Sequence, residues 1–182
     1  AWDLGMSDST AIWVAEIISG EVRVMDFYEA SGESLDHYIK WLDEKGYRDY
    51  THIMPHDVNV RELQTGKSRY QFLTEAGLDI EVAPKSSVED GIQAVRRILP
   101  NCWFNKDKTR AGVECLQNYR RVFNEKTSSF QNRPLHDWSS HAADAFRYLA
   151  LGMDSTGNGQ RTDWSKPFET TLDGDSYKDY YV

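Results

Sequence analysis

Three strand-like segments at the start of the chain, followed by helices and strands in alternation, constrain the fold more than any other feature of the sequence. Residues 2–28 contain one short and two longer apolar segments, the longer two split at Ser19 and Gly20, and they predict a three-stranded meander. Segments with the apolar spacing of helices then alternate with short strands. This order predicts an α/β fold in which a mixed β-sheet is flanked by helices.

The later elements are expected at defined positions. A helix should begin after Ser34 as its N-cap and end at Gly46, because serine favours the first of these positions and glycine the second. The remaining expected segments are a strand at 50–54, a helix at 68–76, a strand at 80–83, helices at 87–99 and 108–117, a β-hairpin at 119–131 with an exposed tip at 124–127, and a helix at 139–152.

Two boundaries follow from these segments. The periodicity stops near Asp154, so we expect a folded domain at 1–153 and a tail or surface wrap at 154–182. The first strand begins almost at Ala1, which is the pattern expected for a domain taken from a longer protein.

The charge distribution is uneven. The formal net charge is −8, but residues 85–133 carry 10 basic and 5 acidic side chains, whereas residues 1–84 carry 7 basic and 16 acidic ones. A basic middle segment in an acidic protein fits a phosphate-binding surface beside a carboxylate metal site, and a solvated charged face is the alternative. The 2 cysteines, Cys102 and Cys115, form no C-x-x-C pair, which argues against zinc and against a disulfide framework.

Three aspartates stand out by their positions. Asp3 lies in the first strand before a glycine turn, Asp57 lies just past the strand at 50–54, and Asp144 lies among alanines of the last helix. Each has an ordinary alternative: Asp3 as a turn residue, Asp57 as a cap, and Asp144 as a salt-bridge partner of Arg147 or Arg121. Together, carboxylates at strand ends and on one helix face are what a hard cation needs.

Such a site predicts phosphodiester hydrolysis supported by two Mg²⁺ or Mn²⁺ ions about 4 Å apart. Carboxylate oxygens suit these ions, whereas zinc prefers histidine and cysteine. Asp8, at the far end of the Gly5 turn, is a candidate fourth ligand. His56 and His141 flank two of the aspartates and are candidates for orienting them, although a lone histidine is more often structural.

Several motifs of this chain resemble those of one family, the nuclease domains of phage large terminases. The segments that carry the resemblance are residues 2–5 with 8–10, 54–57, 66–69 and 134–148, which occur in the family's order across roughly residues 1–152. The resemblance implies a ribonuclease H-like fold and a DNA endonuclease that cuts concatemeric viral DNA during genome packaging in the host cell cytoplasm. It makes Asp3, Asp57 and Asp144 the metal-binding carboxylates.

The resemblance also implies partners: double-stranded DNA, an ATPase motor domain in the same full-length protein, the small terminase subunit and the portal. We expect DNA phosphates to contact a set of basic side chains, namely Lys67, Arg69, Lys85, Arg96, Arg97, Arg120, Arg121 and Lys126. Residues 66–68 mimic the end of a phosphate-binding P-loop, but Arg61 stands where its first glycine should be. The motor is therefore not expected within this chain.

Three other functions share parts of this pattern. A RuvC-like resolvase or a transposase core would use the same fold and carboxylates. An actin-like nucleotide-binding domain could use residues 3–5 with Ser9 and Thr10 to bind phosphate, but it needs a second phosphate loop that this chain lacks. A non-catalytic docking module is disfavoured because all three carboxylates are present.

Overall fold

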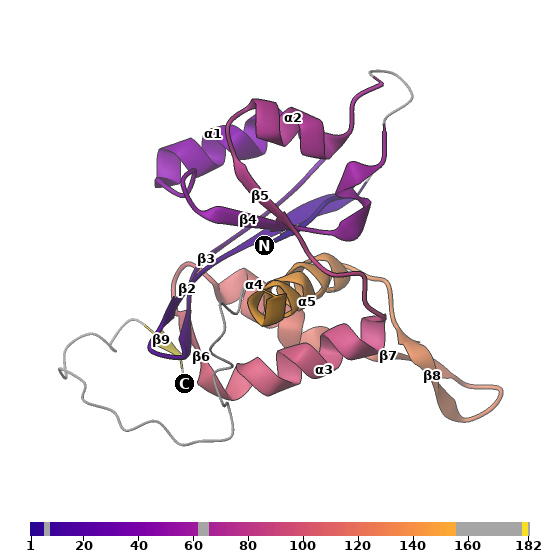
Figure 1. Cartoon of the computed structure of the whole chain (residues 1–182). Coiled ribbons are helices and arrows are strands. Elements are labelled where there is room, and N and C mark those ends of the chain that lie inside the picture. The colour runs from indigo at the N-terminus through magenta and orange to yellow at the C-terminus, as the bar shows by residue number, and fades with distance from the viewer. Residues whose placement is uncertain (6–7, 62–65, 156–179, 182) are drawn as a thin grey trace.

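The computed structural model describes residues 1–5, 8–61, 66–155 and 180–181 of the 182-residue chain (Figure 1). The strands are β1 (Trp2–Asp3), β2 (Ser9–Ile18), β3 (Glu21–Ser31), β4 (Thr51–Met54), β5 (Asp79–Val82), β6 (Cys102–Asn105), β7 (Arg121–Asn124), β8 (Ser129–Pro134) and β9 (Tyr180–Tyr181). The helices are α1 (Leu35–Lys45), α2 (Arg69–Glu75), α3 (Val88–Ile98), α4 (Arg110–Asn118) and α5 (Ser140–Ser155), with short 3-10 helices η1 (His56–Asn59) and η2 (Leu99–Asn101).

The main sheet has the order β1-β2-β3-β6-β9. Its first three strands are the predicted antiparallel meander, in which Trp2 pairs with Ile12 and Ser9 with Ser31. β6 pairs in parallel with β3 and was not predicted, because four residues directly after a helix give too short a pattern to recognise. The sheet is therefore mixed, as the order of elements predicted.

A second pair of strands, β4 and β5, runs in parallel with Thr51 opposite Asp79. β4 packs beside β1, where the indole nitrogen of Trp2 donates a hydrogen bond of 3.2 Å to Nδ1 of His52. This contact connects the strand that carries Asp3 to the strand that leads directly into η1, which contains Asp57.

The two faces of the sheet carry two apolar cores, with α1 and α2 on one side and α3, α4 and α5 on the other (Figure 1). Alternate residues of β2 pack into the two cores, because successive side chains of a strand point to opposite faces. Ala11 and Trp13 pack towards α5, whereas Ile12 and Val14 pack towards α1. The Trp13 indole also donates a hydrogen bond of 2.8 Å to the carbonyl of Ala142, which fixes α5 against the sheet.

The helix ends agree with the sequence in most respects. Gly46 ends α1 in the left-handed conformation, with φ of 74°. Ser68 begins α2 with a full capping box, in which its hydroxyl accepts from the Gln71 backbone and the Gln71 side chain accepts from its own. Ser34 occupies the predicted N-cap of α1, but its side chain makes no capping hydrogen bond.

The predicted hairpin is present as β7 and β8, and the last helix extends three residues further than expected, to Ser155. The predicted tail at 154–182 lies mostly outside the described residues; its described strand, β9, pairs antiparallel with β6. Within the described part of the chain, no helix is both long and apolar enough to cross a membrane.

Candidate active site

Asp3 lies at the end of β1, which contacts both β2 and β4. Its Oδ2 accepts a hydrogen bond of 3.1 Å from Nδ1 of His141 on α5. Burial raises the pKa of the Asp3 carboxyl, and the negative charge of Asp144 raises it further, while His141 acts in the opposite direction. The hydrogen bond to Asp3 in turn raises the pKa of His141. Asp3 is thus a partly buried carboxylate whose charge is stabilised by one histidine.

Asp144 lies on α5, three residues after His141, and has two donors on its Oδ1. The hydroxyl of Tyr119 donates at 3.2 Å, and the guanidinium of Arg147 approaches to 2.8 Å. The salt bridge to Arg147 that the sequence left open is therefore formed. The alternative bridge to Arg121 is not, because that side chain pairs with Glu89 at 3.4 Å. Asp144 therefore forms an ion pair with Arg147, and its negative charge also acts on Asp3.

Asp57 is exposed and lies in η1, immediately after β4. All three aspartates influence the titration of one tyrosine. Burial raises the pKa of Tyr148 to about 12; Arg147 opposes this, and the negative charges of Asp3, Asp144 and Asp57 add to it. The three carboxylates that the sequence singled out therefore all act on the pKa of one side chain of α5.

A second set of ligand atoms lies closer together. Within the described residues, the His, Cys, Asp and Glu side chains whose ligand atoms all approach within 4.8 Å of one another are Asp8, His136 and His141. Nε2 of His136 lies 3.8 Å from Oδ2 of Asp8, and the two imidazole rings have centroids 5.4 Å apart. The three main aspartates do not form such a group in the described part of the chain.

The hydrogen bonds of both histidines leave Nε2 as the metal-binding atom. The hydroxyl of Ser140 donates to the carbonyl of Asp137 at 2.7 Å, so at its 3.0 Å contact with His136 it accepts from Nδ1–H. His141 donates its Nδ1–H to Asp3. Metal-binding histidines commonly donate their other nitrogen to an oxygen in this way, so the donor set fits a divalent cation.

Sequence reasoning did not identify His136. It lies in the loop before α5, where helical periodicity gives no reason to place it beside His141. The one available indication was its presence in the same motif segment, residues 134–148, as two of the other candidates. His56, by contrast, is exposed and precedes Asp57 in η1.

The predicted phosphate-binding residues fall into separate groups. Arg69 donates to the carbonyl of Leu4, next to Asp3, at 3.3 Å, and Lys67 pairs with Glu75 at 2.7 Å. A second group belongs to the β7–β8 hairpin and its base: Arg120, Arg121 and Lys126. Lys85 is exposed in the loop before α3, whereas Arg96 and Arg97 are exposed in the last turn of α3, away from Glu89, which contacts the hairpin.

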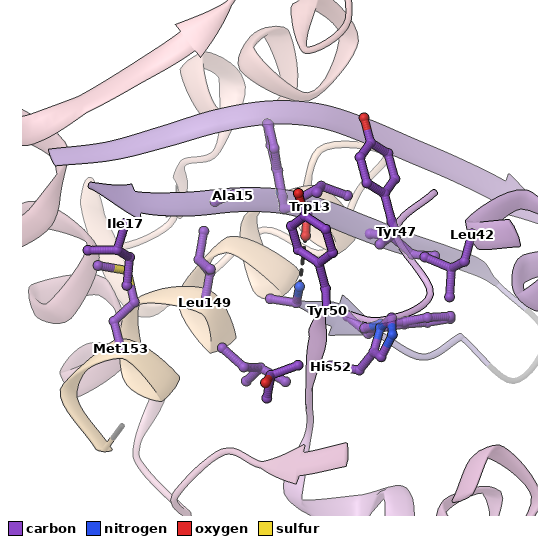
Figure 2. Close-up of a pocket in the computed structure, with 15 residues that line it drawn as sticks. Trp13, Ala15, Ile17, Leu42, Tyr47, Tyr50, His52, Leu149 and Met153 are labelled. Carbon is purple, nitrogen blue, oxygen red and sulfur yellow. Dashed lines mark hydrogen bonds between the residues drawn. The ribbon is translucent and has the colours of Figure 1, made fainter. Parts of the chain in front are cut away.

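A cavity of about 240 Å³ lies at the start of β1. Figure 2 shows its wall of apolar and aromatic side chains, with Ile17, Leu149 and Met153 at one end and Leu42 and His52 at the other. Among its lining residues no carboxylate appears. Asp3, Asp57 and Asp144 are therefore not part of its wall.

Comparisons with known proteins identify the fold. No protein-family model matches the sequence, and no curated protein matches it. The large terminase of a thermophilic bacteriophage, solved in complex with ATP-gamma-S, aligns with a TM-score of 0.63 and 17% identity, over 82% of this chain and 38% of that one. The present chain thus spans less than half of that terminase.

Two isolated nuclease domains match along most of their length. The nuclease domain of the bacteriophage SPP1 large terminase, solved with bound Mn, has a TM-score of 0.60 and 17% identity, covering 81% of this chain and 80% of that one. The P22 large terminase nuclease domain has a TM-score of 0.60 and 17% identity, covering 84% of this chain and 79% of that one. The chain therefore has the ribonuclease H-like fold of large terminase nuclease domains, as its motifs predicted.

Proposed function

We propose that this chain is a metal-dependent DNA endonuclease that cuts concatemeric viral DNA during genome packaging. The observation that carries the proposal is the hydrogen bond between Asp3 and His141, since the ligand atoms of His141 lie close to those of Asp8 and His136. The nuclease domain with bound Mn among the similar structures supports divalent-metal dependence. The fold alone would not suffice, since one fold serves many activities.

We further propose that the site takes two cations. Asp3, Asp57 and Asp144 would hold one ion through carboxylate oxygens, and Asp8, His136 and His141 would hold the other through one oxygen and two imidazole nitrogens. When bound, such a pair supplies an activated water and stabilises the negative charge that develops on the phosphate and the leaving oxygen. The mixed nitrogen and oxygen set favours Mn²⁺ over Mg²⁺, which prefers oxygen alone.

The chain's own residues would position this chemistry. Arg147 and Tyr119 fix the Asp144 carboxylate, and Ser140 and Asp3 fix the two imidazoles. Arg69, through its bond to the Leu4 carbonyl, holds the loop after Asp3. The basic side chains at the hairpin base, Arg120 and Arg121, would contact DNA phosphates, since their exposed ion pairs contribute little and exchange readily.

Further partners belong to the whole protein. We propose that residues 1–153 act as the nuclease domain of a longer protein that also contains the ATPase motor, since the terminase of the thermophilic bacteriophage is matched over 38% of its length. The small subunit, the portal and a location in the host cytoplasm belong to the same proposal.

A plasmid-nicking assay with Mg²⁺, Mn²⁺ and EDTA tests the activity. Asp3→Ala, Asp57→Ala and Asp144→Ala should each reduce cleavage by more than about a hundredfold, because each removes a carboxylate of the reacting centre. Asp107→Ala, which removes an exposed carboxylate from the turn before α4, is the matched control and should cut as the wild type does. Two of the three site variants cutting at the wild-type rate would contradict the assignment.

A further inference from the structure

The β7–β8 hairpin carries a pair of phenylalanines that its role in binding phosphates does not explain. Phe123 and Phe130 are directly opposite each other in the strand register, with ring centroids 5.0 Å apart at an interplanar angle of 63°. They are 51% and 62% exposed. The β7–β8 hairpin projects from the body of the molecule (Figure 1), and both rings are exposed among the residues that the structure describes.

The surroundings of the pair are basic. Residues 119–134 contain Arg120, Arg121, Lys126 and Arg133 but one acidic residue, Glu125. Arg120 and Arg121 form exposed ion pairs with carboxylates outside this segment, at 3.2 and 3.4 Å. Arg133 donates through Nε to the neutral side chain of Gln131. Exposed aromatic rings within a cluster of cations match a polyanion with flat apolar groups, which is the chemistry of nucleic acid, rather than the apolar surface of a protein partner.

Both ends of the hairpin are attached to the proposed active site. Tyr119, just before β7, donates to Asp144 at 3.2 Å, and His136, just after β8, approaches Asp8 at 3.8 Å. Phe123 is four residues from Tyr119, a distance of at most about 13 Å along a strand. One turn of duplex DNA spans roughly 34 Å. A duplex with a phosphate at the site would therefore place its neighbouring base steps within reach of the rings.

We propose that Phe123 and Phe130 insert as an apolar wedge into a base step of duplex DNA close to the cleaved phosphate. The rings displace the stacking of one step, while Arg120, Arg121 and Lys126 hold the flanking phosphates. Apolar side chains inserted between base steps bend and open DNA in this way. The inference rests on the proposed function for the identity of its ligand, but it concerns binding and base unstacking rather than cleavage.

The experiment measures the fluorescence of 2-aminopurine placed in a duplex of about 30 base pairs, titrated with the protein in EDTA so that no cleavage occurs. Unstacking should raise the fluorescence with the wild type. The double variant Phe123→Val/Phe130→Val keeps β-forming residues but has no rings, so it should lose the rise and bind about tenfold more weakly. Ile17→Val, a similar change at an exposed apolar residue of β2, should alter neither quantity.

Two further variants separate insertion of the rings between bases from contact with phosphates alone. Arg121→Ala should lower the affinity and reduce the salt dependence by about one phosphate contact, yet keep the fluorescence rise. Phe130→Trp keeps an aromatic ring and should also keep the rise. Loss of the rise in Phe130→Trp, or a normal rise and affinity in the double valine variant, would overturn the wedge. Cleavage by Asp3→Ala would instead contradict the proposed function, and it leaves this readout unaffected.

Discussion

Asp144 has a cation, Arg147, and a second carboxylate, Asp3, as neighbours. Arg147 is 7% exposed and needs a negative partner, which Asp144 supplies at 2.8 Å. The negative charge of Asp144 also disfavours the ionised form of Asp3, and this helps to raise the Asp3 pKa. A site built for a cation leaves carboxylates in repulsion when the cation is absent. Asp144 forms the direct salt bridge to the buried Arg147, whereas Asp3 is paired with His141.

Neutralising the two residues should therefore have different effects on stability without metal. Asp144→Asn leaves the buried guanidinium with a weaker partner, so the free energy of unfolding should fall by about 2 kcal/mol. For a domain of this size, this change lowers Tm by roughly 4–8 °C. Asp3→Asn should melt no lower than the wild type, because it removes a partly buried charge that Asp144 repels.

Thermal melts in EDTA, with Asp107→Asn as an exposed control, would measure these differences. Equal Tm values for Asp144→Asn and the wild type would show that Arg147 does not depend on Asp144. A large loss in Asp3→Asn would show that the hydrogen bond from His141 outweighs the repulsion.

At the same scale, the acidic residues are easier to single out from the sequence than the histidines are. An aspartate among alanines, or directly after a strand, is unusual enough to be noticed from its neighbours alone. His136 becomes a candidate only through contacts with Asp8 and Ser140, and the loop that brings them together has no periodicity. The tautomer of each histidine likewise depends on hydrogen-bond partners that no sequence pattern specifies.

At the scale of elements, the contact between β1 and β4 includes a hydrogen bond to one buried histidine. His52 accepts a hydrogen bond at Nδ1 from Trp2 and donates one at Nε2 to the carbonyl of Arg48, at 3.0 Å. Protonation would place a second N–H against the Trp2 indole N–H. Burial also lowers the pKa of His52. The neutral form is therefore the one that joins the two strands carrying Asp3 and, through η1, Asp57.

This lowered pKa predicts how stability depends on pH. The unfolded histidine titrates near about pH 6.5 and takes up a proton before the folded one does. The stability contributed by His52 should thus be present above that pH and be lost as the pH falls below it. We expect the Tm difference between the wild type and His52→Gln, whose amide can also donate and accept, to shrink from pH 7.5 to pH 5. Melts at these pH values measure it, and a constant difference would contradict the prediction.

Most elements were predictable because their apolar spacing is regular and their ends carry clear signals. The meander, α1 with Gly46 and α2 with Ser68 are examples. β6 was missed because a four-residue strand gains its identity from pairing with β3, which is a non-local contact. The same reason hides the pairing of β4 with β5, since a sequence shows that two strands exist but not which strand each one joins.

At the scale of the whole molecule, net charge and local charge have different consequences. A formal charge of −8 opposes a polyanion at long range. The basic residues of the hairpin and of the start of α2 are separated in the sequence, yet both are connected to the acidic site in the structure, through Tyr119 and Leu4 respectively. Binding of DNA by this chain alone should thus be weak and strongly dependent on salt and on metal, since the cations also neutralise the acidic centre.

Metal binding should be visible in the stability of the whole chain. A cation that binds only the folded site stabilises it by mass action, by about 2.7 kcal/mol at a concentration one hundred times Kd, or a Tm rise of roughly 5–10 °C. Mn²⁺ should raise Tm more than Mg²⁺ at equal concentration, because His136 and His141 supply nitrogen ligands.

His136→Ala should reduce the Mn²⁺ shift much more than the Mg²⁺ shift, whereas Asp3→Asn should reduce both. His37→Ala is the matched control, because its imidazole contacts Tyr28 and takes no part in the ligand sets. Melts of these proteins with each metal and with EDTA show whether His136 binds the metal or only supports its loop. Equal loss of both shifts in His136→Ala would mean that this histidine supports the loop and binds no metal, and an unchanged Mn²⁺ shift would remove it from the site altogether.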